Sequence, residues 1–191
     1  MAWWRGGDAA VLASLAPLVD RLVLDSQEPA SDWRSAAALA EMTSLSDVRW
    51  TRLTRWRNLM AQFFDLPAIR RAAPDFSRLE VVAADDYGAR LFAAWLASRL
   101  PTRQPLDVQV TAGSHFISGI ALIGPEHRLE LRLTAAATCV RTLMTAPNEA
   151  SARRTVSLGR QSLAAWLEEE MRIRARDTAF EDALRSIAEA A

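Results

Sequence analysis

The stretch Leu129-Glu130-Leu131-Arg132-Leu133 decides the class of fold, because apolar and charged side chains alternate along it. A period of two places the leucines on one face of an extended strand and the charges on the other. Val108 and Val110 alternate with polar residues in the same way, and residues 139–144 are expected to add another strand. Turn residues at 124–126 separate these runs. The middle of the chain therefore predicts an antiparallel meander.

Helix-forming and strand-forming segments surround this meander. On the N-terminal side, apolar spacing predicts helices at about residues 9–19, 32–42 and 48–64, and a short buried strand at 20–26. Asp32, Asp47 or Ser46, and Asp85 are the expected N-caps of three helices, of which the third ends before Pro101. A strand is predicted at 79–83, a loop at 27–31, and two amphipathic closing helices separated near Asp177.

These elements predict a mixed α/β (α+β) fold, in which a mixed sheet with an antiparallel meander is covered by helices. A length of 191 residues suits one domain with a sizeable core. We expect a single domain over residues 1–191, with a helical first part at about 8–72, a sheet-containing part at about 78–145 and closing helices at about 151–190.

The charge balance narrows the classes of partner. The chain has 23 basic and 23 acidic residues and therefore no net charge. A chain without net charge has no overall electrostatic attraction for phosphate backbones. We therefore expect neither nucleic acid nor an anionic membrane as a partner. All 23 basic residues are arginine. A chain without lysine cannot form a Schiff base or build a P-loop.

The single cysteine and the N-terminus point to the cytoplasm. Cys139 has no second cysteine in the chain, so an intrachain disulfide is excluded. The first eight residues lack the basic start and apolar core of a signal peptide. The longest apolar runs are too short to cross a bilayer.

The usual sequence signatures of catalysis are missing. His115 and His127 are the only histidines; a triad of Ser114 or Ser118, His115 and Asp107 can be written, but it has no nucleophile elbow. Cys139 is expected to pack as a small hydrophobic residue. Gly6-Gly7 precedes every predicted strand, so it does not predict a dinucleotide-binding turn. With no metal-ligand spacing either, we expect no catalytic residues, no metal site and no cofactor.

The unusual segment is residues 47–59, where arginine and tryptophan alternate. On a helix Trp50, Leu53 and Arg57 share one face, and Arg49, Arg52 and Trp56 share a neighbouring one. Two uses are open. The tryptophans can be core, with arginines folded over them or paired with Asp25 or Asp65, or the segment can be a binding hot spot. We expect Trp50 and Leu53 to point inward. The predicted partner-binding set is Arg49, Arg52, Arg55, Trp56 and Arg57.

Several segments, in order, resemble the OpcA family, the glucose-6-phosphate dehydrogenase assembly protein of cyanobacteria and actinobacteria. The matching segments are Trp3-Trp4, Asp20-Arg21-Leu22-Val23-Leu24-Asp25-Ser26, Trp50-Thr51-Arg52-Leu53-Thr54-Arg55-Trp56-Arg57, Phe63-Phe64-Asp65, residues 93–100 and residues 180–184. Typical members carry a further N-terminal region before the paired tryptophans. The resemblance implies a non-catalytic protein that binds glucose-6-phosphate dehydrogenase and promotes its assembly or activity. The alternatives are a sugar-phosphate sensor that clamps phosphate with arginines, and an unrecognised enzyme.

Overall fold

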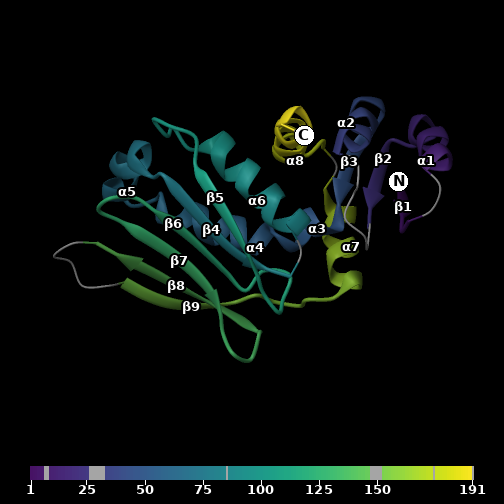
Figure 1. Ribbon diagram of the computed structural model, residues 1–191. Coiled ribbons are helices and arrows are strands. Elements are labelled where there is room, and N and C mark those ends of the chain that lie inside the picture. Colours follow the sequence, from purple (N-terminus) through teal and green to yellow (C-terminus); the bar gives the residue numbers. More distant parts are fainter. Residues whose placement is uncertain (7–8, 26–32, 85, 147–151, 174, 191) are drawn as a thin grey trace. The chain divides into compact units, whose positions relative to one another are not determined.

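The computed structural model describes residues 1–6, 9–25, 33–84, 86–146, 152–173 and 175–190. Within it the chain divides into two compact units (Figure 1). The first unit takes residues 1–53 and 161–191, so it is assembled from both ends of the chain, and the second takes residues 54–160. The predicted N-caps Asp32 and Asp85 and the predicted loop at 27–31 lie outside the described residues.

The first unit contains a three-stranded parallel sheet with the order β1-β2-β3. The strands are β1 (Ala2–Trp4), β2 (Arg21–Leu24) and β3 (Ser44–Asp47). Helices fill the connections, which parallel strands require: α1 (Ala9–Leu15) with a 3-10 turn at Ala16–Leu18, and α2 (Trp33–Met42). Every residue of the central strand β2 is buried, which explains its nearly continuous apolar sequence.

Three more helices complete the first unit. Helix α3 (Val48–Arg52) follows β3 directly and packs against α7 (Leu163–Arg172). Helix α8 (Thr178–Ala190) packs against α2. Asp47 accepts a hydrogen bond from the amide of Arg49 and so caps α3, as the sequence predicts. Because α7 and α8 come from the C-terminal end, the first unit depends on contacts between residues more than a hundred positions apart.

The second unit is built on a six-stranded sheet with the order β5-β4-β6-β7-β8-β9. Strands β4 (Arg78–Ala83) and β5 (Asp107–Ala112) are parallel, and helix α6 (Asp86–Arg99) connects them. The other pairs are antiparallel, through β6 (Gly119–Ile123), β7 (Arg128–Leu133), β8 (Cys139–Thr145) and β9 (Ala152–Ser157). The predicted mixed α/β class and the antiparallel meander are confirmed.

One face of this sheet forms the core of the second unit. Helices α4 (Thr54–Phe63) and α6 pack against it, and α5 (Pro67–Ala72) with the 3-10 turn Ala73–Asp75 follows α4. The alternation in β7 is realised as predicted: Leu129 and Leu131 are fully buried on the helix-covered side. The opposite face carries Glu130 and the arginines next to it, and no described helix of the second unit covers it (Figure 1).

The structure corrects four sequence expectations. The closing helical part does not begin near residue 151, because Ala152–Ser157 pairs with β8 as a sixth strand. The helix expected from 48 to 64 is two helices, α3 and α4, broken at Leu53. Strands β1 and β3 were not predicted. Gly6 therefore follows a strand, contrary to the expectation for Gly6-Gly7, although residues 7 and 8 lie outside the described part. That 1–191 is one domain stays a prediction.

None of the helices in the described part of the chain combines the length and the apolar character needed to cross a bilayer.

Candidate functional site

The tryptophan–arginine segment is divided between the two units at Leu53. The Leu53 amide lies 3.2 Å from the carbonyl oxygen of Arg49 and 3.0 Å from that of Trp50, so the last turn of α3 tightens there. Helix α3 belongs to the first unit and α4 to the second. The segment is therefore not one continuous binding helix.

Two tryptophans of this segment are core residues. Trp50 is 1% exposed; its indole nitrogen donates to Asp177 at 2.7 Å, and its ring lies 5.5 Å from that of Phe180. Trp56 is 3% exposed, and Leu53 is fully buried. The expected inward position of Trp50 and Leu53 is confirmed. Burial leaves little of Trp56 for a partner to touch.

The four arginines of the predicted set have different surroundings. Arg49 is buried in α3, and the half-buried Arg52 places its guanidinium 4.7 Å from the centre of the Trp166 ring in α7. This stacking supplies the cation–π contact that the sequence suggests, but within the chain. The half-buried Arg57 donates to the hydroxyl of Thr54 at 3.3 Å. Arg55 is the exposed arginine of the set.

A buried carboxylate fixes the polar interior beside α3. Glu170 of α7 is 2% exposed and accepts from Arg21 at 2.5 Å, from Ser46 at 2.7 Å and from the hydroxyl of Thr51. Arg21 also donates to the carbonyl oxygens of residues 173 and 175. These contacts join β2, β3, α3 and α7. The sequence did not predict this site, since its members are spread over 150 positions with no local pattern.

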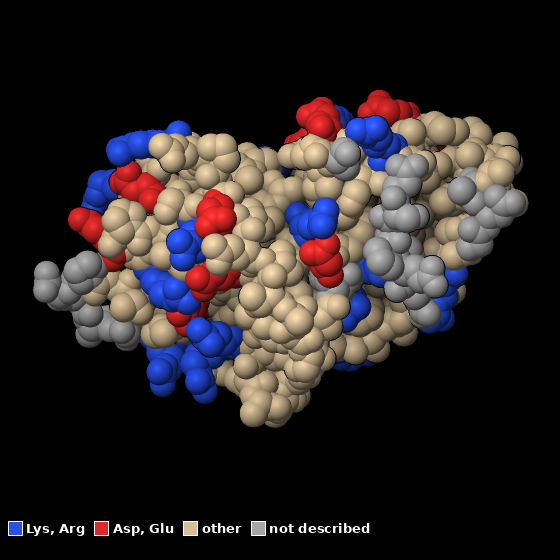
Figure 2. Space-filling view, viewed as in Figure 1, with Lys and Arg blue, Asp and Glu red and all other residues tan. Residues whose placement is uncertain are grey.

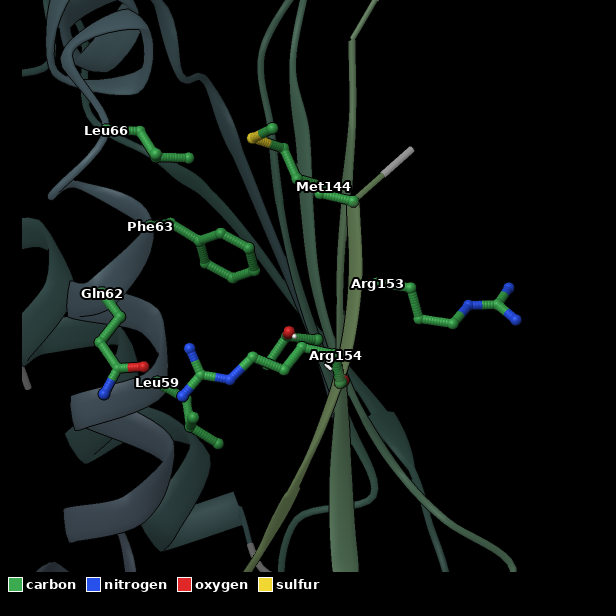
Figure 3. Close-up of a pocket in the computed structure, with 9 residues that line it drawn as sticks. Leu59, Gln62, Phe63, Leu66, Met144, Arg153 and Arg154 are labelled. Carbon is green, nitrogen blue, oxygen red and sulfur yellow. Dashed lines mark hydrogen bonds between the residues drawn. The ribbon is translucent and has the colours of Figure 1, made fainter. Parts of the chain in front are cut away.

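The second unit has a pocket of about 320 Å³ between α4 and strands β8 and β9 (Figure 3). Its helix side is Leu59, Gln62, Phe63 and Leu66, and its strand side is Thr142, Met144, Ala152, Arg153 and Arg154. Arg154 extends towards the helix, whereas Arg153 points away from it. Arg55 lies one turn before Leu59 and so on the same stripe of α4.

Arginines gather where β8 and β9 lie (Figure 2). Arg141, Arg153 and Arg154 are all exposed, and within the described residues no carboxylate lies within ion-pair distance of their guanidinium groups. The sequence pattern did not predict this cluster, because residues 151–157 were expected in the closing helices. A strand is indicated only weakly by the sequence here, through the run Thr155-Val156-Ser157 that follows the Arg153-Arg154 pair.

The neighbouring arginines of the same sheet are paired instead. Arg128 donates to Glu80 at 3.2 Å and also to Glu130, and Arg132 donates to Glu130 at 2.9 Å. Burial raises the pKa of Glu130, but hydrogen bonds from Arg132 and Arg128 outweigh it and hold the pKa below its ordinary value. In turn, the hydrogen bond to Glu130 raises the pKa of Arg128 above its ordinary value. These arginines and glutamates therefore form ion pairs with one another.

The conceivable catalytic triad is not assembled. The hydroxyl of Ser114 lies 3.0 Å from Nδ1 of His115, but the Asp107 carboxylate pairs with Arg78 at 3.3 Å at the opposite end of β5. Cys139 is half-buried at the start of β8, so it is less enclosed than expected. Among the described residues, no group of three His, Cys, Asp or Glu side chains has a metal-binding arrangement.

Comparison with protein families gives one match across most of the chain. The family model that describes the C-terminal domain of the OpcA glucose-6-phosphate dehydrogenase subunit matches residues 43–184. The OxPP cycle protein OpcA of Nostoc punctiforme is 31% identical over 135 residues, which cover 66% of the chain and 29% of that protein. The protein of the same name from Synechocystis is 26% identical over 135 residues, covering 66% and 28%. The match thus spans less than a third of each relative.

Solved structures share the fold at low identity. A mutant of KijD10, a 3-ketoreductase from Actinomadura kijaniata, in complex with TDP-benzene and NADP, matches with a TM-score of 0.59 at 14% identity, covering 95% of this chain and 72% of that one. A second structure of KijD10 matches with a TM-score of 0.50 at 10% identity, covering 95% and 66%. At such identities the likeness concerns the fold alone.

Proposed function

Because the chain belongs to the OpcA glucose-6-phosphate dehydrogenase subunit family, we propose that it is a non-catalytic subunit that binds glucose-6-phosphate dehydrogenase in the cytoplasm and promotes its assembly or activity. The match over residues 43–184 carries this proposal, because it runs from β3 into α8 and so includes the whole second unit and part of the first. The curated relatives connect the chain to the pentose-phosphate pathway.

The geometry supports binding over catalysis. Asp107, the carboxylate that the sequence offers for a triad with Ser114 and His115, is engaged by Arg78 instead. The buried Glu170 is fully occupied by three donors from its own chain. Exposed arginines are enriched at protein interfaces, where they form paired contacts with carboxylates.

Arg55 is the member of the predicted partner-binding set best placed to contact another protein. Its side chain is exposed on α4, on the stripe that continues along the pocket through Leu59 and Gln62. Arg52 and Arg57 are half-buried and can contribute part of their guanidinium surface. We propose that Arg55 and Arg57, with the exposed arginines of β8 and β9 in the same unit, face an acidic patch on the dehydrogenase.

Co-purification tests the function directly. The tagged chain and the glucose-6-phosphate dehydrogenase of the same organism, mixed in equal amounts, should elute together and show a higher specific activity than the dehydrogenase alone. Separate elution with unchanged activity would contradict the proposal. A rise in melting temperature with sugar phosphates alone would instead favour the sensor.

Replacing Arg55 tests the contact surface. We expect Arg55→Ala to weaken dehydrogenase binding by roughly 1–3 kcal/mol, as for an interface arginine that matters, while the melting temperature stays nearly unchanged. Arg71→Ala is the matched control, because Arg71 is also exposed in the second unit and lies outside the pocket lining. If both variants bind the dehydrogenase as tightly as the wild type does, the interface lies elsewhere than on α4.

A further inference from the structure

Strand β9 presents an open edge of the six-stranded sheet. It is the last strand in the order β5-β4-β6-β7-β8-β9, and no strand among the described residues pairs with its outer side. The amide of Leu158 donates to the carbonyl oxygen of Thr138 at 3.0 Å, which marks these residues as a hydrogen-bonded antiparallel pair. Bonded pairs alternate along such a ladder, so Ala152, Arg154 and Val156 point their backbone groups at β8.

The same alternation turns the amides and carbonyls of Arg153 and Thr155 outward. A side-chain contact agrees with this assignment, because Thr142 of β8 donates to the inward carbonyl of Arg154 at 3.4 Å. Both Arg153 and Thr155 are exposed. Another extended chain could therefore hydrogen-bond to this edge without disturbing the β8–β9 pairing.

The side chains around this edge favour negative charge. Arg153 lies on the open face of the sheet, diagonal to Arg141, which is opposite Thr155. Arg154 lies on the other face and extends into the pocket (Figure 3). Arg128 and Arg132 in β7 have Glu80 and Glu130 as partners, whereas these three arginines have no carboxylate among the described residues.

The pocket beside the edge favours apolar side chains. Leu59, Phe63, Leu66 and Met144 supply large apolar side chains to its lining, and its polar residues are Gln62, Thr142, Arg153 and Arg154. Leu66 is 43% exposed, so part of its side chain is accessible at the pocket. A strand added to β9 would direct every second side chain towards this pocket and the others towards Arg153 and Arg141.

Charges on an edge strand often only prevent unwanted pairing. That role would be served by Arg153 alone, and it accounts neither for Arg141 on the inner strand nor for the apolar pocket on the opposite face. On the premise that the chain binds the dehydrogenase, we propose that β9 and the α4–β9 pocket bind an extended segment of that enzyme in which acidic and apolar residues alternate. The acidic side chains meet Arg153 and Arg141, and the apolar ones enter the pocket beside Arg154.

Charge reversal tests the side-chain part of the proposal. The double variant Arg141→Glu/Arg153→Glu should bind the dehydrogenase at least about tenfold more weakly than the wild type, since two favourable charges become repulsive. The matched control Arg71→Glu should bind as the wild type does. Wild-type affinity of the double variant would overturn the proposal.

A backbone change tests the strand pairing. Thr155→Pro removes an outward amide that β8 does not use, so it should lower dehydrogenase affinity about tenfold or more, whereas Thr155→Ala keeps the amide and should bind normally. Hydrogen exchange of the wild type supplies a readout that does not depend on a folded variant. The amides of Arg153 and Thr155 should exchange fast in the free chain and slowly in the complex. Unchanged exchange in a formed complex would overturn the proposal.

A synthetic peptide separates this proposal from the proposed function. An eight-residue peptide of alternating glutamate and leucine should bind the chain alone and compete with the dehydrogenase, while alternating lysine and leucine should not. If the dehydrogenase binds the wild type but neither variants nor peptide affect it, the edge is not the site, although the chain is still a subunit. If the dehydrogenase does not bind the wild type at all, the proposed function fails first.

Discussion

Glu170 is the residue on which the polar interior of the first unit depends. Removing a charge from water is costly unless partners replace the water, and here a guanidinium and two hydroxyls do so. Because Arg21 is buried as well, each member of the pair needs the other. We expect the pair to fix the position of α7 on β2 more than to add net stability.

We expect Glu170→Ala to destabilise the first unit by about 3–5 kcal/mol, because Arg21 would remain buried without a counter-charge. Urea unfolding followed by tryptophan fluorescence measures this change. Glu168→Ala is the control: Glu168 pairs with Arg172 on the exposed side of the same helix, and its loss should cost about 0.5 kcal/mol or less. Equal effects of the two variants would show that the buried pair is dispensable.

Substitutions of Trp50 test the apolar part of the interior of the first unit. Trp50→Ala should destabilise the fold by about 3–5 kcal/mol, because it opens a cavity against Phe180 and leaves Asp177 without the indole donor. Trp50→Phe should cost less, since it keeps most of the ring volume. Trp3→Ala, at a position 44% exposed, should change the melting temperature little. A stable Trp50→Ala protein would contradict the core assignment.

At the scale of elements, the charged face of the six-stranded sheet couples stability to pH. The pKa of Glu130 in the folded state lies below its ordinary value of 4.5, because Arg132 and Arg128 stabilise the ionised form more than burial disfavours it. A lowered pKa adds stability that is fully present above 4.5 and is lost as the pH falls through the folded-state pKa.

We therefore expect the free-energy difference between the wild type and Glu130→Gln to be largest above about pH 5 and to shrink as the pH falls below the ordinary carboxyl range. Urea unfolding between about pH 6 and pH 3 measures this difference. Arg132→Met should reduce the same pH dependence, because it removes one of the two arginine hydrogen bonds to Glu130. A pH-independent difference would show that Glu130 titrates alike in both states.

At the scale of the whole molecule, the two units differ in how the chain builds them. The second unit is continuous from residue 54 to 160, whereas the first requires both ends. A chain ending at residue 160 loses Glu170 and helix α8, the packing partner of α2. We expect hydrogen exchange of this shortened chain to show fast exchange in β2 and retained protection in β6 and β7. Retained protection in β2 would contradict the division.

The sequence determined the elements whose pattern is local. The alternation at 129–133 specified β7, the spacing of apolar residues specified α7 and α8, and the position of Trp50 and Leu53 specified an inward face. The tryptophan–arginine segment also identified the family. These signals are readable because a period of two or of 3.6 residues directly encodes which side chains face the core.

Only the tertiary structure decided the features that depend on distant partners. Ala152–Ser157 is exposed except for the half-buried Val156 and has no apolar period, so its pairing with β8 is what makes it a strand. Strand β3 is polar yet buried, since Glu170, far along the chain, accepts its hydrogen bond from Ser46. Packing also decides which arginine of the segment is exposed. Trp166 covers Arg52, and no pattern in residues 47–59 encodes that contact. Such pairings arise from long-range contacts, which a sequence period cannot express.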